Sequence, residues 1–224
     1  MSDRAARAAA AAAAWDNVAG APELLHEREN AVFRVPLSSG AMAALRLHRP
    51  GYQSPEGIVA ELRLTEALAE AGFPCPRPIR TSGGALTSDR DGELASLVSW
   101  CAGAPLGAAN PGGQPGARCM ARLGALTARM HGAVDALGLP PLPRPAWDAE
   151  GLMGEAPLWG RFWESPALAP AEAALLAEAR DWARQRLAEL EAPDFGLIHA
   201  DLMVENVLDD GAALALIDFD DCGT

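Results

Sequence analysis

The chain has 224 residues, 50 % hydrophobic and 5 % aromatic, so it is long enough to bury a core and too apolar to be a disordered chain. Its 18 basic and 30 acidic residues give a net charge of −12, which argues against nucleic acid or an anionic membrane surface as the main partner. All 18 basic residues are arginine, so any step that needs a lysine must use arginine instead or be absent.

The acidic charge is concentrated at one end of the chain. Residues 1–186 hold all 18 arginines and 20 acids, whereas residues 187–224 hold ten acids and no base. Such a run of acids is often a solvated face. The alternative is a cation site, because hard divalent ions bind carboxylate and amide oxygens.

The cysteines and the N-terminus bear on the compartment. The four cysteines are widely spaced and form no C-x-x-C pair, which disfavours a disulfide framework or a thiolate zinc site and favours a reducing compartment. The alanine-rich N-terminus is too weakly apolar for a secretion signal or a membrane span, so we expect a surface helix or a frayed end there. These features predict a cytoplasmic protein without membrane contact, and they do not indicate its oligomeric state.

The first part of the chain alternates short apolar runs with turn residues. Runs at 31–35 and 43–48 flank Ser38-Ser-Gly40 and predict a β-hairpin. Ser54 precedes a proline and begins a helical pattern that ends at Gly72, so we expect Ser54 to be its N-cap.

A second hairpin is expected after this helix. Its strands are predicted at 77–81 and 94–100, with a turn at Ser82-Gly-Gly84 and a polar connection at 88–92.

Composition then changes, which predicts two lobes. A connection rich in glycine and proline at 103–116 divides an N-lobe, 1–101, from a mainly helical C-lobe, 102–224. Helices are predicted at 119–137 and 170–190. Apolar residues at helical spacing in the second of these are expected to face the core: Leu175, Leu176, Ala179, Trp182, Ala183 and Leu187.

The chain returns to strands at its end and brings polar residues together there. Strands are predicted at 196–199, 206–208 and 213–217, the last two forming a hairpin around Asp209-Asp-Gly211. In an antiparallel hairpin the start of the first strand lies beside the end of the second, so Asn206 and Asp218 should be neighbours.

This arrangement predicts a magnesium site next to a base. One amide oxygen and one carboxylate, from Asn206 and Asp218, suit Mg²⁺, which takes few protein ligands and leaves the rest to water and substrate phosphates. Asp201, in the preceding loop, is placed to accept a proton from an attacking hydroxyl. Phosphoryl transfer requires this division of labour.

These motifs resemble those of the aminoglycoside phosphotransferase, choline kinase and homoserine-kinase-like superfamily, which has a protein-kinase-like fold. The family's H-x-D-x-x-x-x-N loop and D-x-D correspond to His199 to Asn206 and to Asp218-Phe-Asp220. The segments 45–56 and 123–131 resemble the branch of the bacterial stress-response and homoserine-kinase-like enzymes. The resemblance covers nearly the whole chain from about Ala31 and implies an α+β, bilobal fold with a small N-lobe antiparallel sheet plus helix, and a mainly helical C-lobe with a catalytic hairpin.

The resemblance also implies roles in the ordered motifs. Asp201 would be the catalytic base, Asn206 and Asp218 the metal ligands with Asp218 bridging metal and triphosphate, and Asp220 an outer-shell or second-metal group. Arg46 takes the place of the residue that grips the α- and β-phosphates, with Glu61 as its ion-pair partner. A surface salt bridge is the plainer interpretation of that pair.

The segment 98–101 would be the hinge that binds adenine through its backbone, which makes Ser99 and Cys101 candidate nucleotide-binding residues. Two departures from the family pattern stand out. The turn Arg28-Glu-Asn30 is not glycine-rich, and the chain ends at Thr224, before the further helices with which relatives complete the C-lobe. We therefore expect a C-lobe truncated at its C-terminus that leaves an apolar face exposed.

The sequence thus predicts an enzyme that uses ATP and Mg²⁺ to transfer a γ-phosphoryl group to a hydroxyl. The acceptor would be a small molecule such as homoserine, choline or an aminoglycoside, or a Ser/Thr side chain of a protein, and the acidic C-lobe favours a cationic one. The alternative is a truncated, catalytically inactive kinase-like module that binds nucleotide only.

Overall fold

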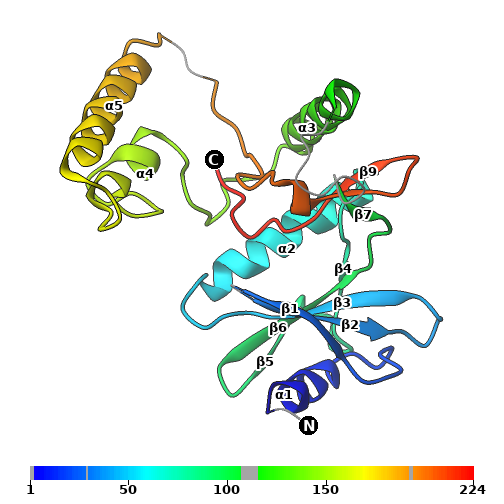
Figure 1. Ribbon diagram of the computed structural model, residues 1–224. Coiled ribbons are helices and arrows are strands. Elements are labelled where there is room, and N and C mark those ends of the chain that lie inside the picture. Colours follow the sequence, from blue (N-terminus) through cyan, green and yellow to red (C-terminus); the bar gives the residue numbers. More distant parts are fainter. Residues whose placement is uncertain (1–2, 29, 107–115, 192–193) are drawn as a thin grey trace. The chain divides into compact units, whose positions relative to one another are not determined.

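The computed structural model describes residues 3–28, 30–106, 116–191 and 194–224 (Figure 1). By their contacts, they form one compact unit from Met1–Pro143 with Asp201–Asp220 and another from Arg144–Ala200 with Asp221–Thr224. The lobe boundary expected after residue 101 divides the chain differently and stays a prediction. Most of the predicted connection, 107–115, lies outside the described residues, as does Glu29.

An antiparallel sheet of six strands forms the first part of the larger unit. The strand order is β1-β2-β3-β6-β4, and β5 also pairs with β6, on the edge that β4 uses. The strands are β1 (Glu23–Glu27), β2 (Ala31–Pro36), β3 (Met42–Leu47), β4 (Pro78–Ile79), β5 (Thr87–Arg90) and β6 (Glu93–Ser99).

Helices α1 (Asp3–Ala12) and α2 (Pro55–Glu70) cover opposite faces of this sheet (Figure 1). The α1 side holds the main apolar core, in which Trp15, Phe33 and Leu97 are almost fully buried. The indole N–H of Trp15 donates to the carbonyl of Ile79 at 2.7 Å, so its one polar atom is satisfied. The N-terminal helix is therefore part of the core and not merely a surface helix.

Several predictions for this region are confirmed. The hairpin at 31–35 and 43–48 is β2 and β3, and the predicted helix is α2. The Ser54 hydroxyl accepts the backbone N–H of Gly57 at 3.0 Å, as expected of an N-cap.

The second hairpin was only partly predicted. β4 does pair with β6, but the polar segment expected to be a connection contains β5, which turns into β6 through Asp91-Gly92. Both turn residues have positive φ, 55° and 81°, as tight hairpins require. β5 was missed because it is a polar edge strand, and β1 because all five of its residues are exposed.

A second, smaller sheet and helix α3 complete the larger unit. Strands β7 (Ala104–Pro105), β8 (Val207–Asp209) and β9 (Leu214–Leu216) pair in that order, and α3 spans Ala117–Leu137. β7 was not predicted, because two exposed residues carry no periodicity. Arg122 of α3 donates twice to the Asp209 carboxylate, at 2.8 and 3.1 Å, which fixes the helix to the β8–β9 hairpin.

The smaller unit contains α4 (Ala149–Met153), the short helix η1 (Phe162–Glu164) and α5 (Pro170–Ala188). Helix α5 lies where it was predicted, but its expected core face is wrong: Leu175 and Trp182 are 64 % and 65 % exposed. The reason is that α5 contacts η1 and α4 through its arginine side, where Arg180 stacks on the Trp163 ring 4.1 Å from its centroid.

The strand predicted at 196–199 is also wrong, since only an isolated bridge joins Ile198 to Gly223. Four free thiols account for all the cysteines, in agreement with the absence of a disulfide framework. None of the helices in the described ranges is long and apolar enough to cross a membrane.

Candidate active site

The β8–β9 hairpin places the first pair of candidate residues. The backbone N–H of Ile217 donates to the carbonyl of Asn206 at 2.9 Å, and Val207 pairs with Leu216. Asp218 therefore follows directly after the residue opposite Asn206. This is the juxtaposition that the twelve-residue spacing predicted.

Asp201 is held by the same asparagine. The Asn206 side-chain nitrogen donates to the Asp201 carboxylate at 2.7 Å and to its backbone carbonyl at 3.0 Å. Asn206 is buried and Asp201 is half-buried, so water reaches this bond only in part. With its nitrogen on Asp201, Asn206 has its amide oxygen to offer a cation.

Two residues of this region hold a strained backbone. Asp218 has φ 64° and Ala200, directly before Asp201, has φ 66°. Residues other than glycine seldom adopt this left-handed conformation, which costs of order 1–3 kcal/mol and is concentrated at functional sites. Both candidate acids are thus set by local geometry that a regular strand or helix would not give.

Arg46 of β3 lies among three carboxylates. It donates to Glu61 of α2 and to Asp218, each at 3.2 Å, and to Asp220. Burial alone would lower the pKa of Arg46, but the charges of these acids outweigh it and raise the pKa above its usual value. Glu61 is itself buried, so the Arg46–Glu61 pair is not a surface salt bridge.

The two acids of the D-x-D motif have different surroundings. The Asp218 side chain is 42 % exposed, whereas Asp220 is buried with one carboxylate oxygen on Arg46 and the other on Asn30. Partial burial, reinforced by the negative charges of Asp220 and Asp201, raises the pKa of Asp218, while Arg46 opposes that rise.

Three residues of the site were not predicted from the sequence. Asn30 bonds Asp220, and the Gln53 side chain donates to the Asp220 backbone carbonyl at 3.0 Å. The buried His48 ring bonds the Ser96 hydroxyl at 2.9 Å. Asparagine in a loop usually serves a turn, and glutamine is usually exposed, so neither type indicates a site contact. The position of Asn30 directly before a predicted strand was the one sequence signal.

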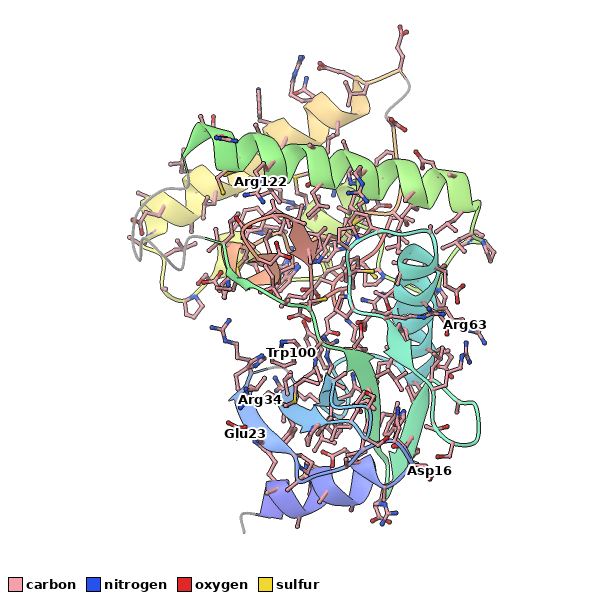
Figure 2. The ribbon with its side chains drawn as sticks, turned by 90° about the vertical axis from the view of Figure 1, so that its right-hand side faces the viewer. Asp16, Glu23, Arg34, Arg63, Trp100 and Arg122 are labelled. Atoms are coloured by element: carbon pink, nitrogen blue, oxygen red, sulfur yellow. The ribbon has the colours of Figure 1, made fainter. Side chains whose placement is uncertain are left out.

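The expected hinge follows β6. The Ser99 N–H donates to the Arg77 carbonyl at 2.8 Å, and its hydroxyl accepts the Arg77 N–H, so Ser99 belongs to the sheet. Trp100 stands where the chain leaves the sheet (Figure 2). In the same view Arg34 of β2 lies beside Glu23 of the edge strand β1, to which it donates at 2.7 Å. Burial raises the pKa of the next residue, Cys101, to about 11, so its thiol is neutral at pH 7.

The donor set suits a hard cation with few protein ligands. An amide oxygen from Asn206 and the half-exposed carboxylate of Asp218 are ligand types that Mg²⁺ prefers. Among the residues that the structure describes, no group of three or more His, Cys, Asp or Glu side chains could hold a metal. A zinc or iron centre of such ligands is therefore not found there, whereas a magnesium site completed by water and phosphate fits.

Comparison with known proteins identifies the family. The sequence pattern of the phosphotransferase enzyme family matches residues 20–224, which is most of the chain. The chain belongs to this family. The superfamily predicted from the ordered motifs is thereby confirmed.

Curated relatives include homoserine kinases. That of Methylobacillus glycogenes is 34 % identical over 160 residues, 70 % of this chain and 45 % of the relative. That of Methylobacillus flagellatus is 35 % identical over 169 residues, 74 % of this chain and 48 % of the relative. The chain thus spans about half the length of the curated relatives it matches.

Solved structures support the same fold. A microcompartment-associated aminopropanol kinase is 29 % identical, with a TM-score of 0.77 over 94 % of this chain and 67 % of that one. An amicoumacin kinase in complex with AMP-PNP, Ca²⁺ and Ami is 20 % identical, also with a TM-score of 0.77, over 100 % of this chain and 65 % of that one. These likenesses confirm the predicted α+β protein-kinase-like fold.

Proposed function

We propose that this chain forms the nucleotide and metal site of a kinase that transfers the γ-phosphoryl group of ATP to a hydroxyl of a small molecule. The observation that carries the proposal is the Asn206–Asp201 hydrogen bond of 2.7 Å, together with the hairpin register that places Asn206 next to Asp218. Family membership supports the same reaction class. A cytoplasmic location remains part of the prediction.

Asp201 is the proposed general base. Its carboxylate accepts the Asn206 N–H, which fixes the orientation of the group that would take the proton of an acceptor hydroxyl. Asn206 therefore does two things, since it orients the base with its nitrogen and offers its oxygen to the cation. In phosphoryl transfer the protein contributes mainly such positioning together with electrostatic stabilisation.

Asn206 and Asp218 are the proposed ligands of Mg²⁺. When bound, the ion would neutralise charge on the transferring phosphate. Arg46 is the proposed phosphate contact, because its planar guanidinium can bind two oxygens at once. Its contact with the half-exposed Asp218, at 3.2 Å, is the one most easily exchanged for phosphate.

The adenine would bind at the end of β6. Ser99 is already paired with Arg77, so the backbone of Cys101 is the better candidate to bond the base. The neutral Cys101 thiol would line the pocket as a small apolar group.

The proposed acceptor class is the small amino alcohols. Relatives are named for homoserine and aminopropanol, which both carry an amine and a hydroxyl. Residues 187–224 hold ten acids and no base, and such a field attracts a cationic acceptor. A protein Ser/Thr side chain is the alternative that the experiment must separate.

The test is a transfer assay with Mg²⁺ and ATP against homoserine, 1-amino-2-propanol, choline, kanamycin and a mixed Ser/Thr peptide library. Phosphorylated product is identified by mass spectrometry, and Asp201→Asn serves as the matched variant. We expect transfer to an amino alcohol, and turnover lower by about 10³-fold in Asp201→Asn with unchanged nucleotide affinity.

Equal turnover in Asp201→Asn would refute the assignment of the base. Phosphorylation of peptides alone would overturn the acceptor class. Nucleotide binding with no transfer to any acceptor would favour the alternative of a catalytically inactive module.

A further inference from the structure

The second acid of the D-x-D motif has a surrounding unlike that of a metal ligand. Asp220 is 8 % exposed. One of its carboxylate oxygens accepts from the Arg46 guanidinium and the other from the Asn30 amide. Its backbone carbonyl accepts from the Gln53 amide at 3.0 Å.

The donors come from three separate segments of the larger unit. Asn30 precedes β2, Arg46 lies in β3, and Gln53 lies in the loop before α2. Asn30 is itself fixed, because its amide oxygen accepts the backbone N–H of Arg49 at 3.1 Å. Asp220 thus connects the sheet, the loop before α2 and the strained segment that carries Asp218.

The two acids of the motif differ in their charged partners and in their exposure to solvent, which favours different roles. Asp220 accepts from the Arg46 guanidinium and from the Asn30 amide. A buried carboxylate that already accepts from both has little remaining capacity to bind a hydrated divalent ion. Asp218 makes one contact with Arg46, at 3.2 Å, and is 42 % exposed, so a cation with its water can reach it.

We infer that Asp220 is a positioning residue that holds Arg46 and the Asn30 segment in the orientation needed for the nucleotide phosphates, and that it is not a ligand of the metal. This inference rests on the nucleotide site of the proposed function. It assigns Asn30 and Gln53 to the same task, acting through Asp220.

Removing the metal separates a positioning role of Asp220 from a role as metal ligand. ATP binding is measured by calorimetry with EDTA and with Mg²⁺, for wild type, Asp220→Asn, Asp218→Asn and the exposed control Asp16→Asn. If Asp220 is a positioning residue, Asp220→Asn should weaken ATP binding about tenfold or more both with EDTA and with Mg²⁺. If Asp220 is instead a metal ligand, Asp220→Asn should leave metal-free ATP binding unchanged or tighter. It should lose only the added affinity that Mg²⁺ gives, as we expect for Asp218→Asn.

A swapped pair sharpens the test. Asn30→Asp combined with Asp220→Asn restores an amide–carboxylate pair in reverse and keeps one negative charge in that pair. We expect the double variant to regain most of the affinity that Asp220→Asn loses. A metal ligand would not be rescued in this way, because the carboxylate is then at another position.

The results that would overturn this inference differ from those that would overturn the proposed function. Wild type that fails to bind ATP with Mg²⁺ would refute the nucleotide site itself. Wild type that binds, with Asp220→Asn losing only the effect of Mg²⁺, would overturn the positioning role alone. If Asp220→Asn does not fold, Asn30→Ala gives the same comparison, with a smaller loss expected under both conditions.

Discussion

The β2–β3–β6 sheet and helix α5 both carry regularly spaced apolar side chains, but only the sheet buries them. Phe33, Leu45 and Leu97 are 0–1 % exposed, whereas Leu175 and Trp182 of α5 are 64 % and 65 % exposed. The sheet is covered on one face by α1 and on the other by α2. Helix α5 instead contacts its own unit through arginines, Arg180 and Arg184, which donate to the Met153 carbonyl.

The difference shows that periodicity specifies the type of an element but not its partner. A strand that is covered on both faces gains about 25 cal/mol for each Å² of apolar surface removed from water. A helix that is covered on one side gains only what that side buries. The stability of the larger unit should therefore respond to core substitutions far more than that of α5.

The largest expected effect is in the sheet core. Phe33→Ala removes a buried ring between α1 and the strands and should cost about 3–5 kcal/mol of unfolding free energy. Urea denaturation followed by circular dichroism measures it. A cost below about 1 kcal/mol would contradict the packing described for this sheet.

The next effect is in the smaller unit. Arg180 stacks on the buried Trp163 ring and donates to Met153, so Arg180→Ala should cost about 2 kcal/mol. Arg186→Ala, on the same helix with an exposed side chain that pairs with Glu189, is the matched control and should cost less than about 0.5 kcal/mol. Equal costs would mean that the arginine side of α5 does not hold it.

The unfolding free energy should depend on pH through a buried histidine of the sheet region. Burial, together with the nearby Arg46 charge, lowers the pKa of His48 to about 3, below the unfolded value of about 6.5. Its contribution is therefore complete above pH 6.5 and is lost as the pH falls toward 3. Between pH 6.5 and 5, wild type should lose up to about 1.4 kcal/mol per pH unit relative to His48→Gln, because the unfolded chain binds one more proton.

Denaturation of wild type and His48→Gln at several pH values checks this. If the unfolding free energies of the two proteins changed in parallel with pH, His48 would not be held neutral.

The smallest effect is expected on the exposed face of α5. Leu175→Ala and Trp182→Ala should each change stability by less than about 0.5 kcal/mol, since neither side chain is buried in the structure. A loss above about 2 kcal/mol in the same denaturation assay would show that this face is covered in solution.

The parts of the molecule that the sequence predicts are those with strong local signals. The Ser54 cap, the β2–β3 hairpin and the register that joins Asn206 to Asp218 each follow from residues close in sequence. Asp201 and Asn206 belong to a motif in which the spacing itself carries the chemistry.

The parts that the sequence did not predict depend on partners far away in the chain. Asn30 bonds an acid 190 residues later, and Gln53 one 167 residues later. Exposed β1 and polar β5 lack the alternation that identifies half-buried strands. The apolar residues of α5 recur at helical spacing, but spacing alone does not distinguish an exposed face from a buried one.

The most direct test of the central claim, that Arg46, Asn206 and Asp218 form a metal–nucleotide site, is the thermal stability of the chain with ATP, with Mg²⁺ and with both. We expect both together to raise the melting temperature most, increasingly with nucleotide concentration, and Asp218→Asn to remove the added effect of Mg²⁺. No shift with ATP and Mg²⁺, in a chain that melts cooperatively, would contradict it.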